Sequence, residues 1–427
     1  MKNIVYITID CLRKDALPLY NPTLDLDLFI NNFFRESFIF NNCITAASAT
    51  GPSLSSIMLS QFPFHHGYRL NGTIYDFETP TLAEKLSQQG LTCGGVVSVD
   101  HLGTYFQFGK GFHRYYDFRR IDKLYKQSTI IRKLYNLYLF RWQRFFLPRE
   151  KDDPNVRFSC PAKKITKNGL RFLKDVKDKP FFLWVHYFDL HRIQKSNPNY
   201  IHNYEDLRKG QLTKYLNALK EADSEIEKLI NYIKEKGKLE DTIFILSADH
   251  GEAIFDREDK NIFQFYTGHG RSVYEEEINI PLLIRYPGFR QQRVVDRLIR
   301  TIDIYPTLVE LMDSAIDHPI DGESFANIFR NQEWDREDFA YAEGYSEHSD
   351  IACLRTSEWK LIRNGRWKDE LYHIIEDRGE KRNLVDTETT VYRRMMDQLS
   401  DLLHDQKKHE RESDEKVTQM LKDLGYM

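Results

Sequence analysis

Apolar and polar residues follow two different periods along this chain. Continuous apolar runs rich in β-branched and aromatic residues predict buried strands at residues 4–9, 91–99, 181–188, 242–247 and 278–286. In other segments apolar residues recur every three or four positions, which predicts amphipathic helices, for example at residues 81–89 and 213–236. Strands that alternate with helices predict an α/β fold with a doubly wound, mostly parallel central sheet.

The pattern changes near residue 338. Short apolar runs follow one another there with only turns between them, at residues 339–343, 352–355, 359–363 and 370–374. They predict a small antiparallel sheet, and the residues from about 390 to 404 predict a helix after it. We therefore expect an α/β domain over residues 1–337 and a C-terminal α+β subdomain over residues 338–427.

Composition narrows the class of protein. Of the 427 residues, 41% are apolar and 29% are charged, and the net charge of −3 lacks the basic excess typical of nucleic-acid binding. The five cysteines are scattered, with no Cys-x-x-Cys pair, which favours reduced thiols. The first apolar run begins at residue 4 and no run approaches ~18 residues. We therefore expect no signal peptide, no transmembrane segment and a cytoplasmic location.

Residues from about 113 to 155 differ from the rest as a basic, aromatic insertion. Arginine and lysine outnumber the acids there and alternate with tyrosine, phenylalanine and leucine. One interpretation is a lid, or a surface for a polyanionic substrate or an anionic membrane, with peripheral membrane contact through residues 113–151. The other is a helix pair that packs its aromatic face on the sheet and leaves its basic residues in solvent. The pattern leaves both open.

Polar residues stand where the predicted parallel strands end. Asp10 follows the first strand, and Asp249 and His250 follow the strand at residues 242–247. The strand at residues 181–188 contains His186 and is followed by His191. Ligands of open α/β sheets bind outside these carboxyl ends, so these side chains are expected at one rim. For Asp10 alone, a helix N-cap is an equally good interpretation.

Thr50 and His269 are two further candidates. Thr50 stands just before Pro52 at a loop-to-helix junction, where backbone N–H groups and the helix dipole favour an anion. Taken alone, Thr50 would also suit an ordinary N-cap. His269 lies between Gly268 and Gly270, a pattern typical of a sharp bend or a close backbone approach.

Together these candidates could form a metal-dependent catalytic site. The carboxylates, hydroxyl and imidazole of Asp10, Thr50, Asp249 and His250 suit one divalent cation, Mn²⁺ or Zn²⁺ rather than Ca²⁺. Coordination to a cation would activate the weakly nucleophilic threonine hydroxyl.

Basic side chains would bind the anionic group that reacts. His191, His269 and Arg271 would hold the peripheral oxygens of a phosphoryl or sulfuryl group. One of these groups, when protonated, would donate to the leaving oxygen. Supporting positions are predicted for Arg13, Asp15, His66 and His186.

An ordered set of motifs runs along most of the chain. It comprises Ile7-Thr8-Ile9-Asp10, Thr50-Gly51-Pro52-Ser53, His66-Gly67, Ser247-Ala248-Asp249-His250-Gly251-Glu252, Gly268-His269-Gly270, Tyr274-Glu275-Glu276, Trp359-Lys360-Leu361-Ile362 and Leu424-Gly425-Tyr426. This set resembles the sulfatase family of the alkaline phosphatase superfamily. The resemblance implies an alkaline-phosphatase-like fold, a divalent cation and chemistry on an anionic ester.

The chain departs from that family at positions that matter for its chemistry. True sulfatases have Cys or Ser in Cys/Ser-x-Pro-Ser-Arg and convert it to formylglycine, whereas this chain has Thr50 there and Leu54 for the arginine. Cys11 stands where a second metal-binding aspartate is common, and His269 where many members have lysine. The set of an acid, a threonine, an aspartate and a histidine around one divalent cation is similar to that of phosphotransferase relatives such as lipoteichoic acid synthases and phosphoethanolamine transferases.

The function expected from residues and resemblance is hydrolysis or transfer of phosphate esters through Thr50, on a small-molecule, glycan or lipid-linked substrate. A second in-line attack can release a threonyl-phosphate, whereas a threonyl-sulfate lacks the elimination route of a formylglycine hydrate. Two alternatives stay open, namely a sulfuric ester hydrolase and an inactive protein that binds anionic glycans or lipids.

Overall fold

A twisted sheet of eight strands forms the centre of the protein. The computed structural model describes residues 2–72, 78–117, 160–193, 204–256, 267–346, 349–365 and 367–403. The strands lie in the order β10-β2-β9-β6-β1-β5-β3-β4. Their bounds are β1 Asn3–Ile9, β2 Phe38–Ile44, β3 Thr92–Val96, β4 Arg114–Tyr116, β5 Phe181–Tyr187, β6 Thr242–Ala248, β9 Asn279–Arg285 and β10 Arg293–Arg300.

Every strand of this sheet runs parallel to the others except β9, which pairs antiparallel with both β2 and β6. The central strands β1, β5 and β6 are buried along their whole length, as expected for a parallel sheet covered on both faces. In register, Ile9 at the end of β1 lies beside Tyr187 of β5 and Ala248 of β6. The residues that follow β1 and β6 therefore emerge side by side.

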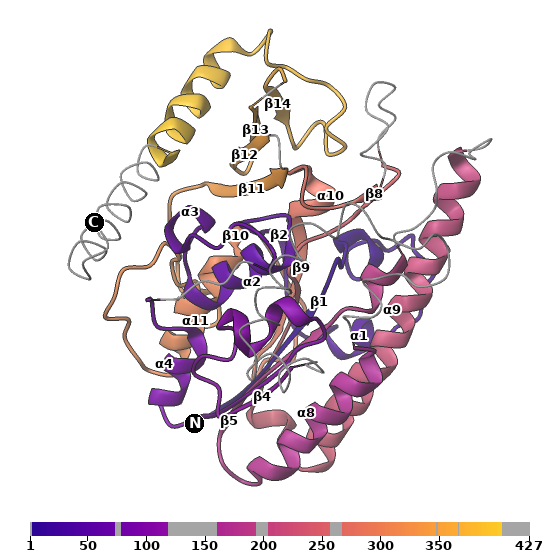
Figure 1. Ribbon diagram of the computed structural model, residues 1–427, viewed down its shortest axis with the longest axis vertical. Coiled ribbons are helices and arrows are strands. Elements are labelled where there is room, and N and C mark those ends of the chain that lie inside the picture. The colour runs from indigo at the N-terminus through magenta and orange to yellow at the C-terminus, as the bar shows by residue number, and fades with distance from the viewer. Residues whose placement is uncertain are drawn as a thin grey trace, which may run out of the picture.

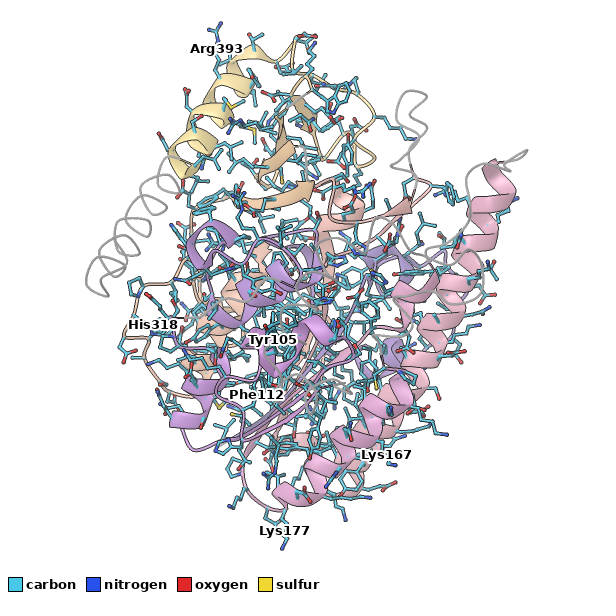
Figure 2. The ribbon with its side chains drawn as sticks, viewed as in Figure 1. Tyr105, Phe112, Lys167, Lys177, His318 and Arg393 are labelled. Carbon is cyan, nitrogen blue, oxygen red and sulfur yellow. The ribbon has the colours of Figure 1, made fainter. Side chains whose placement is uncertain are left out.

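Helices cover both faces of the sheet. Figure 1 shows α8 (Ala162–Val176) and α9 (Tyr204–Glu235) packed along one side, together with the short α1 (Phe29–Phe33). The other side carries α2 (Thr50–Leu59), α3 (Pro63–His66), α4 (Leu82–Gln88) and α11 (Ile304–Leu311). On α8 the apolar stripe faces the sheet, and Figure 2 shows Lys167 and, just past the helix, Lys177 at the surface.

A second, smaller sheet lies beyond the main one. Its four antiparallel strands are β11 (Ala340–Ser346), β12 (Ser349–Arg355), β13 (Trp359–Asn364) and β14 (Glu370–His373), and residues 389–403 form a helix that packs against it. The aromatic ring of Tyr341 contacts those of Phe62 and Phe64, with centroid separations of 5.4 and 5.2 Å. The small sheet is thus joined to the start of α3 by a shared apolar core.

The predicted fold class is confirmed, including the small antiparallel sheet and the C-terminal helix. The strand predicted at residues 91–99 is shorter, covering only Thr92–Val96, and the long helix starts earlier, at Tyr204. Most of the predicted basic insertion, namely residues 118–155, lies outside the described residues. No helix in the described ranges has the length and apolarity to span a bilayer. The domain boundary at residue 338 stays a prediction.

Candidate active site

Three adjacent strands bring the predicted site residues to one rim of the sheet. Asp10 follows β1 directly, and its backbone N–H donates to the carbonyl of Tyr187 at 2.8 Å. Asp249 and His250 follow β6, the neighbour of β1 on one side. His186 comes from β5, the neighbour on the other side. The prediction that the ends of parallel strands assemble these residues describes the geometry well.

Thr50 lies in the same cluster, at the first residue of α2. Its Oγ1 donates to Asp10 Oδ2 at 3.1 Å and lies 3.2 Å from His250 Nε2. The helix is preceded by Ala49 as N-cap, with no side-chain capping bond. The N-cap interpretations of Thr50 and of Asp10 are therefore wrong, since their side chains interact with each other instead of capping helices.

Asp10 and Asp249 place two carboxyl groups in the protein interior. Both are fully buried. Burial raises the pKa of Asp10, but the surrounding histidines, His186 foremost, outweigh it and hold that pKa well below its usual range. Burial and the charge of Asp10 raise the pKa of Asp249 well above its usual range. With no cation, one proton would thus reside on Asp249, because two buried carboxylates cannot both be ionised cheaply.

The donor atoms fit a bound divalent cation. Asp249 Oδ1 accepts from the N–H groups of His250 and Cys11 at 2.8 and 3.2 Å, but its Oδ2 is buried and has no hydrogen-bond partner among the described residues. That oxygen lies 3.5 Å from His250 Nε2. Thr50 Oγ1 lies at similar distances from Asp10 and His250, as given above. These separations between donor atoms are close to the separation of about 3.3 Å between neighbouring ligands of a tetrahedral cation. Asp10, Thr50, Asp249 and His250 could therefore hold one cation.

His250 is suited to be a neutral ligand in this set. Burial and the neighbouring His269 lower the pKa of His250 to about 3. Its Nδ1 lies 2.8 Å from the carbonyl oxygen of Gly251, which assigns the ring proton to Nδ1. The lone pair of Nε2 then points toward Thr50, in the manner of a metal-binding imidazole held by an outer hydrogen bond.

His269 differs from His250 in its protonation. Its Nδ1 lies 3.0 Å from Glu252 Oε2. Burial disfavours the imidazolium, but the charge and hydrogen bond of Glu252 outweigh this and raise the pKa of His269 to about 9. His269 is thus protonated at neutral pH, and its ring lies 4.1 Å from that of His250. A protonated imidazole beside the candidate nucleophile can bind an anion or donate a proton.

His191 lines the same site. It stands in the 3-10 helix Asp189–Ile193 after β5, and its ring stacks on Phe188 at 4.2 Å and lies 5.1 Å from that of His269. Burial lowers the pKa of His191, although Asp10 works in the other direction. Its Nδ1 is buried without a hydrogen-bond partner in the described part of the chain.

The remaining predicted residues divide into groups. His186 Nε2 lies 3.6 Å from Asp10 Oδ2, and its Nδ1 lies 2.9 Å from Thr8 Oγ1. Arg13 forms two-pronged ion pairs with Asp15 and Asp256 and also donates to the carbonyl of Glu252 at 2.9 Å. These contacts hold the segment that follows the strand β6.

His66 and Arg271 form no hydrogen bond or ion pair with the candidate cation ligands in the described part of the chain. His66 Nε2 pairs with Ser56 Oγ at 2.9 Å, so it supports α2 from within the core. Arg271 is exposed, and no hydrogen bond or ion pair links it to other described residues. Its role in substrate binding stays a prediction.

Two site residues were not singled out from the sequence. Glu252 was quoted only as part of a motif, although it sets the charge of His269. His101 follows β3, and its Nε2 is buried without a hydrogen-bond partner among the described residues. The charge of His101 contributes to the lowered pKa of His191. The rule that pointed to Asp10, a polar residue after an apolar strand, would also have found His101.

The short helix α10 (Glu275–Ile278) fastens two segments of the site. The N–H of Gly251 donates to the carbonyl of Glu277 at 2.7 Å, and the N–H of Glu252 to that of Glu276 at 3.1 Å. The N–H of Gly270, beside His269, donates to Glu277 Oε2 at 3.2 Å. The segment with the candidate ligands Asp249 and His250 and the His269 loop are therefore held by one element.

The fold and this site define a hydrolase of the alkaline phosphatase superfamily. The family model Sulfatase matches residues 2–314, and the model for the N-sulphoglucosamine sulphohydrolase C-terminal region matches residues 264–409. The chain belongs to the sulfatase family.

Known proteins of similar sequence and structure agree with this assignment. An ulvan-active sulfatase of Formosa agariphila is 24% identical over 90% of this chain and 77% of its own length. An arylsulfatase of Clostridium perfringens is also 24% identical, over 94% and 93% of the two chains. Among solved structures, a 2-O GAG sulfatase superposes with a TM-score of 0.74 at 18% identity, covering 96% of this chain and 94% of its own. A phosphonate monoester hydrolase from Silicibacter pomeroyi gives a TM-score of 0.70 at 18% identity over 96% of both chains.

Proposed function

We propose that this protein is a metal-dependent hydrolase of phosphate esters that uses Thr50 as its nucleophile. One observation carries the proposal: Thr50 Oγ1 is buried between Asp10 and His250, at 3.1 and 3.2 Å, in the donor set suited to a cation. Threonine cannot become formylglycine by the route that uses cysteine or serine. A hydroxyl nucleophile therefore has to form and then lose an ester bond by two substitutions.

The residues divide the work of the first substitution. A bound cation would supply charge neutralisation for the anionic ester and for the nucleophilic oxygen. Thr50 Oγ attacks phosphorus, and its proton passes toward Asp10, whose Oδ2 already accepts that hydrogen. The bond from phosphorus to the leaving oxygen breaks as protonated His269 gives its proton to that oxygen. The products are a free alcohol and a phosphorylated Thr50.

The second substitution releases the enzyme. Water attacks phosphorus, the bond to Thr50 Oγ breaks as Asp10 returns to that oxygen the proton it took in the first step, and a phosphate or phosphate monoester leaves. Neutral His269, formed in the first step, can accept the proton of that water. If an alcohol replaces water in this step, the same site acts as a phosphotransferase.

A second candidate is hydrolysis of sulfate esters, which the relatives favour. The named relatives include an ulvan-active sulfatase and an arylsulfatase, and one structural neighbour is described in complex with a disulfated glucosamine. The phosphonate monoester hydrolase neighbours support the first candidate instead. Both sets of names point to an anionic ester, carried in several of these relatives by a sugar.

A direct comparison of substrates distinguishes phosphate-ester hydrolysis from sulfate-ester hydrolysis. Purified protein is assayed with aryl phosphate monoesters, aryl phosphodiesters and aryl sulfates that share one leaving group. We expect faster turnover of a phosphate substrate, and a phosphothreonine at Thr50 after acid quench, detected by mass spectrometry. Faster turnover of the aryl sulfate would favour the second candidate. No turnover, with no metal in the purified protein, would leave a binding protein for anionic glycans or lipids.

Substitutions of the nucleophile test its role. Thr50→Ala should abolish turnover, because no other hydroxyl among the described residues contacts both Asp10 and His250. Thr50→Ser should keep part of the activity. Thr213→Ala is a matched control, since its hydroxyl lies on the exposed face of α9 and, within the described part of the chain, donates only to the Lys209 carbonyl, so this variant should behave as wild type.

A further inference from the structure

Cys11 occupies an unusual place for a thiol. It follows Asp10 directly, its side chain is completely buried, and its Sγ lies 2.9 Å from Asp10 Oδ1 and 3.5 Å from His269 Nδ1. Its backbone has a φ of 60°, in the left-handed region that side chains other than glycine rarely adopt. The N–H of Cys11 donates to Asp249 Oδ1 at 3.2 Å, which ties this conformation to the second carboxylate.

Cys11 Sγ lies among the candidate donor atoms for the cation. One donor atom each of Asp10, Cys11 and His250 lies within 4.8 Å of the others. Asp249 Oδ2, buried and without a hydrogen-bond partner among the described residues, lies 3.5 Å from the His250 nitrogen of this cluster. A packing role for a small buried thiol does not require this position between a carboxylate and two imidazoles.

We propose that Cys11 Sγ is a ligand of the divalent cation and makes the site selective for Zn²⁺ over Ca²⁺ and Mg²⁺. The proposal rests on the cation site of the proposed function. On binding, the S–H bond breaks, its proton passes to solvent and the sulfur electron pair forms the bond to the metal. Calcium and magnesium prefer oxygen donors, whereas zinc takes thiolate, imidazole and carboxylate together. The family position of a second aspartate would thus be filled by a softer ligand.

Replacement of the metal by cobalt tests directly whether the sulfur of Cys11 is a ligand. The metal is removed with a chelator, and one equivalent of Co²⁺ is added. Ligand-field bands in the visible range report that cobalt is bound, and an intense near-ultraviolet band reports a sulfur-to-cobalt charge transfer. We expect both in the wild type, and only the visible bands in Cys11→Ser. Cys93→Ser is the matched control, because Cys93 is also buried but, within the described part of the chain, its Sγ hydrogen-bonds only to the backbone carbonyls of Ala83 and Leu91, and this variant should keep both bands.

Competition experiments test the selectivity. In the wild type, Zn²⁺ should displace Co²⁺ and a large excess of Ca²⁺ should not. Cys11→Asp restores an oxygen donor, so Zn²⁺ should bind at least about tenfold more weakly and Mn²⁺ or Ca²⁺ should compete better. An unchanged order of metal preference in Cys11→Asp would contradict the proposal.

A further measurement uses the wild-type protein, so its outcome does not depend on whether the variants fold. X-ray absorption at the zinc edge of Zn-loaded wild type should show one sulfur at about 2.3 Å. Bound metal without a sulfur neighbour would overturn the role of Cys11 and leave the cation site of the proposed function intact. Absence of any bound metal would overturn both.

Discussion

His269 Nδ1 lies 3.0 Å from Glu252 Oε2, and the two side chains are only 12% and 5% exposed. The two residues are separated in sequence by a segment that includes residues 257–266, and they meet beside the candidate nucleophile. In this buried site the carboxylate fixes the charge of the imidazole, because burial alone would favour the neutral ring.

Glu252→Gln should therefore weaken proton donation by His269. The amide keeps the shape of the side chain but removes the charge that raises the pKa of His269 to about 9. We expect kcat to fall by about 100-fold or more for an alkyl ester with a poor leaving group. The decrease should be much smaller for an activated aryl ester, which needs no protonation. Steady-state rates for the two substrates measure this, and equal losses on both would show that Glu252 acts only through folding.

The raised pKa of the buried Glu277 should make the stability of the protein depend on pH. Burial raises the pKa of Glu277 to about 8, well above its value in an unfolded chain. Between about pH 4.5 and 8 the folded protein therefore keeps a proton that the unfolded chain has released. This contribution of Glu277 to the free energy of unfolding is largest at low pH and decreases as the pH rises through this interval.

Glu277→Gln removes this titration and can still accept from the N–H of Gly270. Relative to wild type, the variant should gain stability as the pH rises, by up to ~3 kcal/mol between pH 5 and pH 8. Urea unfolding of both proteins across this range measures the difference. A constant difference between them would mean that Glu277 is ionised in the folded protein.

The strands of the sheet, and the polar residues at their ends, could be predicted from the local pattern of apolar and polar residues. Buried strands are continuous apolar runs, and the geometry of a parallel sheet then brings Asp10, Asp249 and His186 together. The pairing of Glu252 with His269 could not be predicted, because it depends on the path of the segment between them. The contacts of α10 with Gly251 and Glu252 could not be predicted from side chains, because they use the backbone carbonyls of Glu277 and Glu276. Arg271, chosen for its charge and its place in a motif, is exposed.

Lys360 should be essential for stability. Its side chain is completely buried, and Nζ lies 3.3 Å from Glu275 Oε1 and 2.7 Å from Glu380 Oε1. Lys360→Met would leave two buried carboxylates without this partner, so the free energy of unfolding should fall by about 3–5 kcal/mol. Because Glu275 begins α10, activity should fall as well.

Lys368→Met provides the control for this prediction. Lys368 also forms an ion pair, with Asp386, but both side chains are exposed, at 62% and 74%. Exposed pairs contribute little, so this variant should lie within about 1 kcal/mol of wild type. Chemical denaturation of the two variants gives the comparison, and similar losses in both would contradict the assignment of a buried ionic contact between the small sheet and α10.

Gly251→Ala should disturb the metal ligands without changing any of them. A Cβ at this position would lie 2.0 Å from the backbone oxygen of Glu276, so either α10 or the segment with Asp249 and His250 must move. We expect metal content and kcat to fall at least tenfold, as for the loss of an outer contact to a ligand. Gly210→Ala in α9 is the matched control, because a Cβ there meets no atom within 4 Å and alanine favours a helix by about 0.8–1.0 kcal/mol. Metal analysis and activity of the two variants measure the effect, and a fully metallated, active Gly251→Ala protein would show that α10 does not fix the ligand segment.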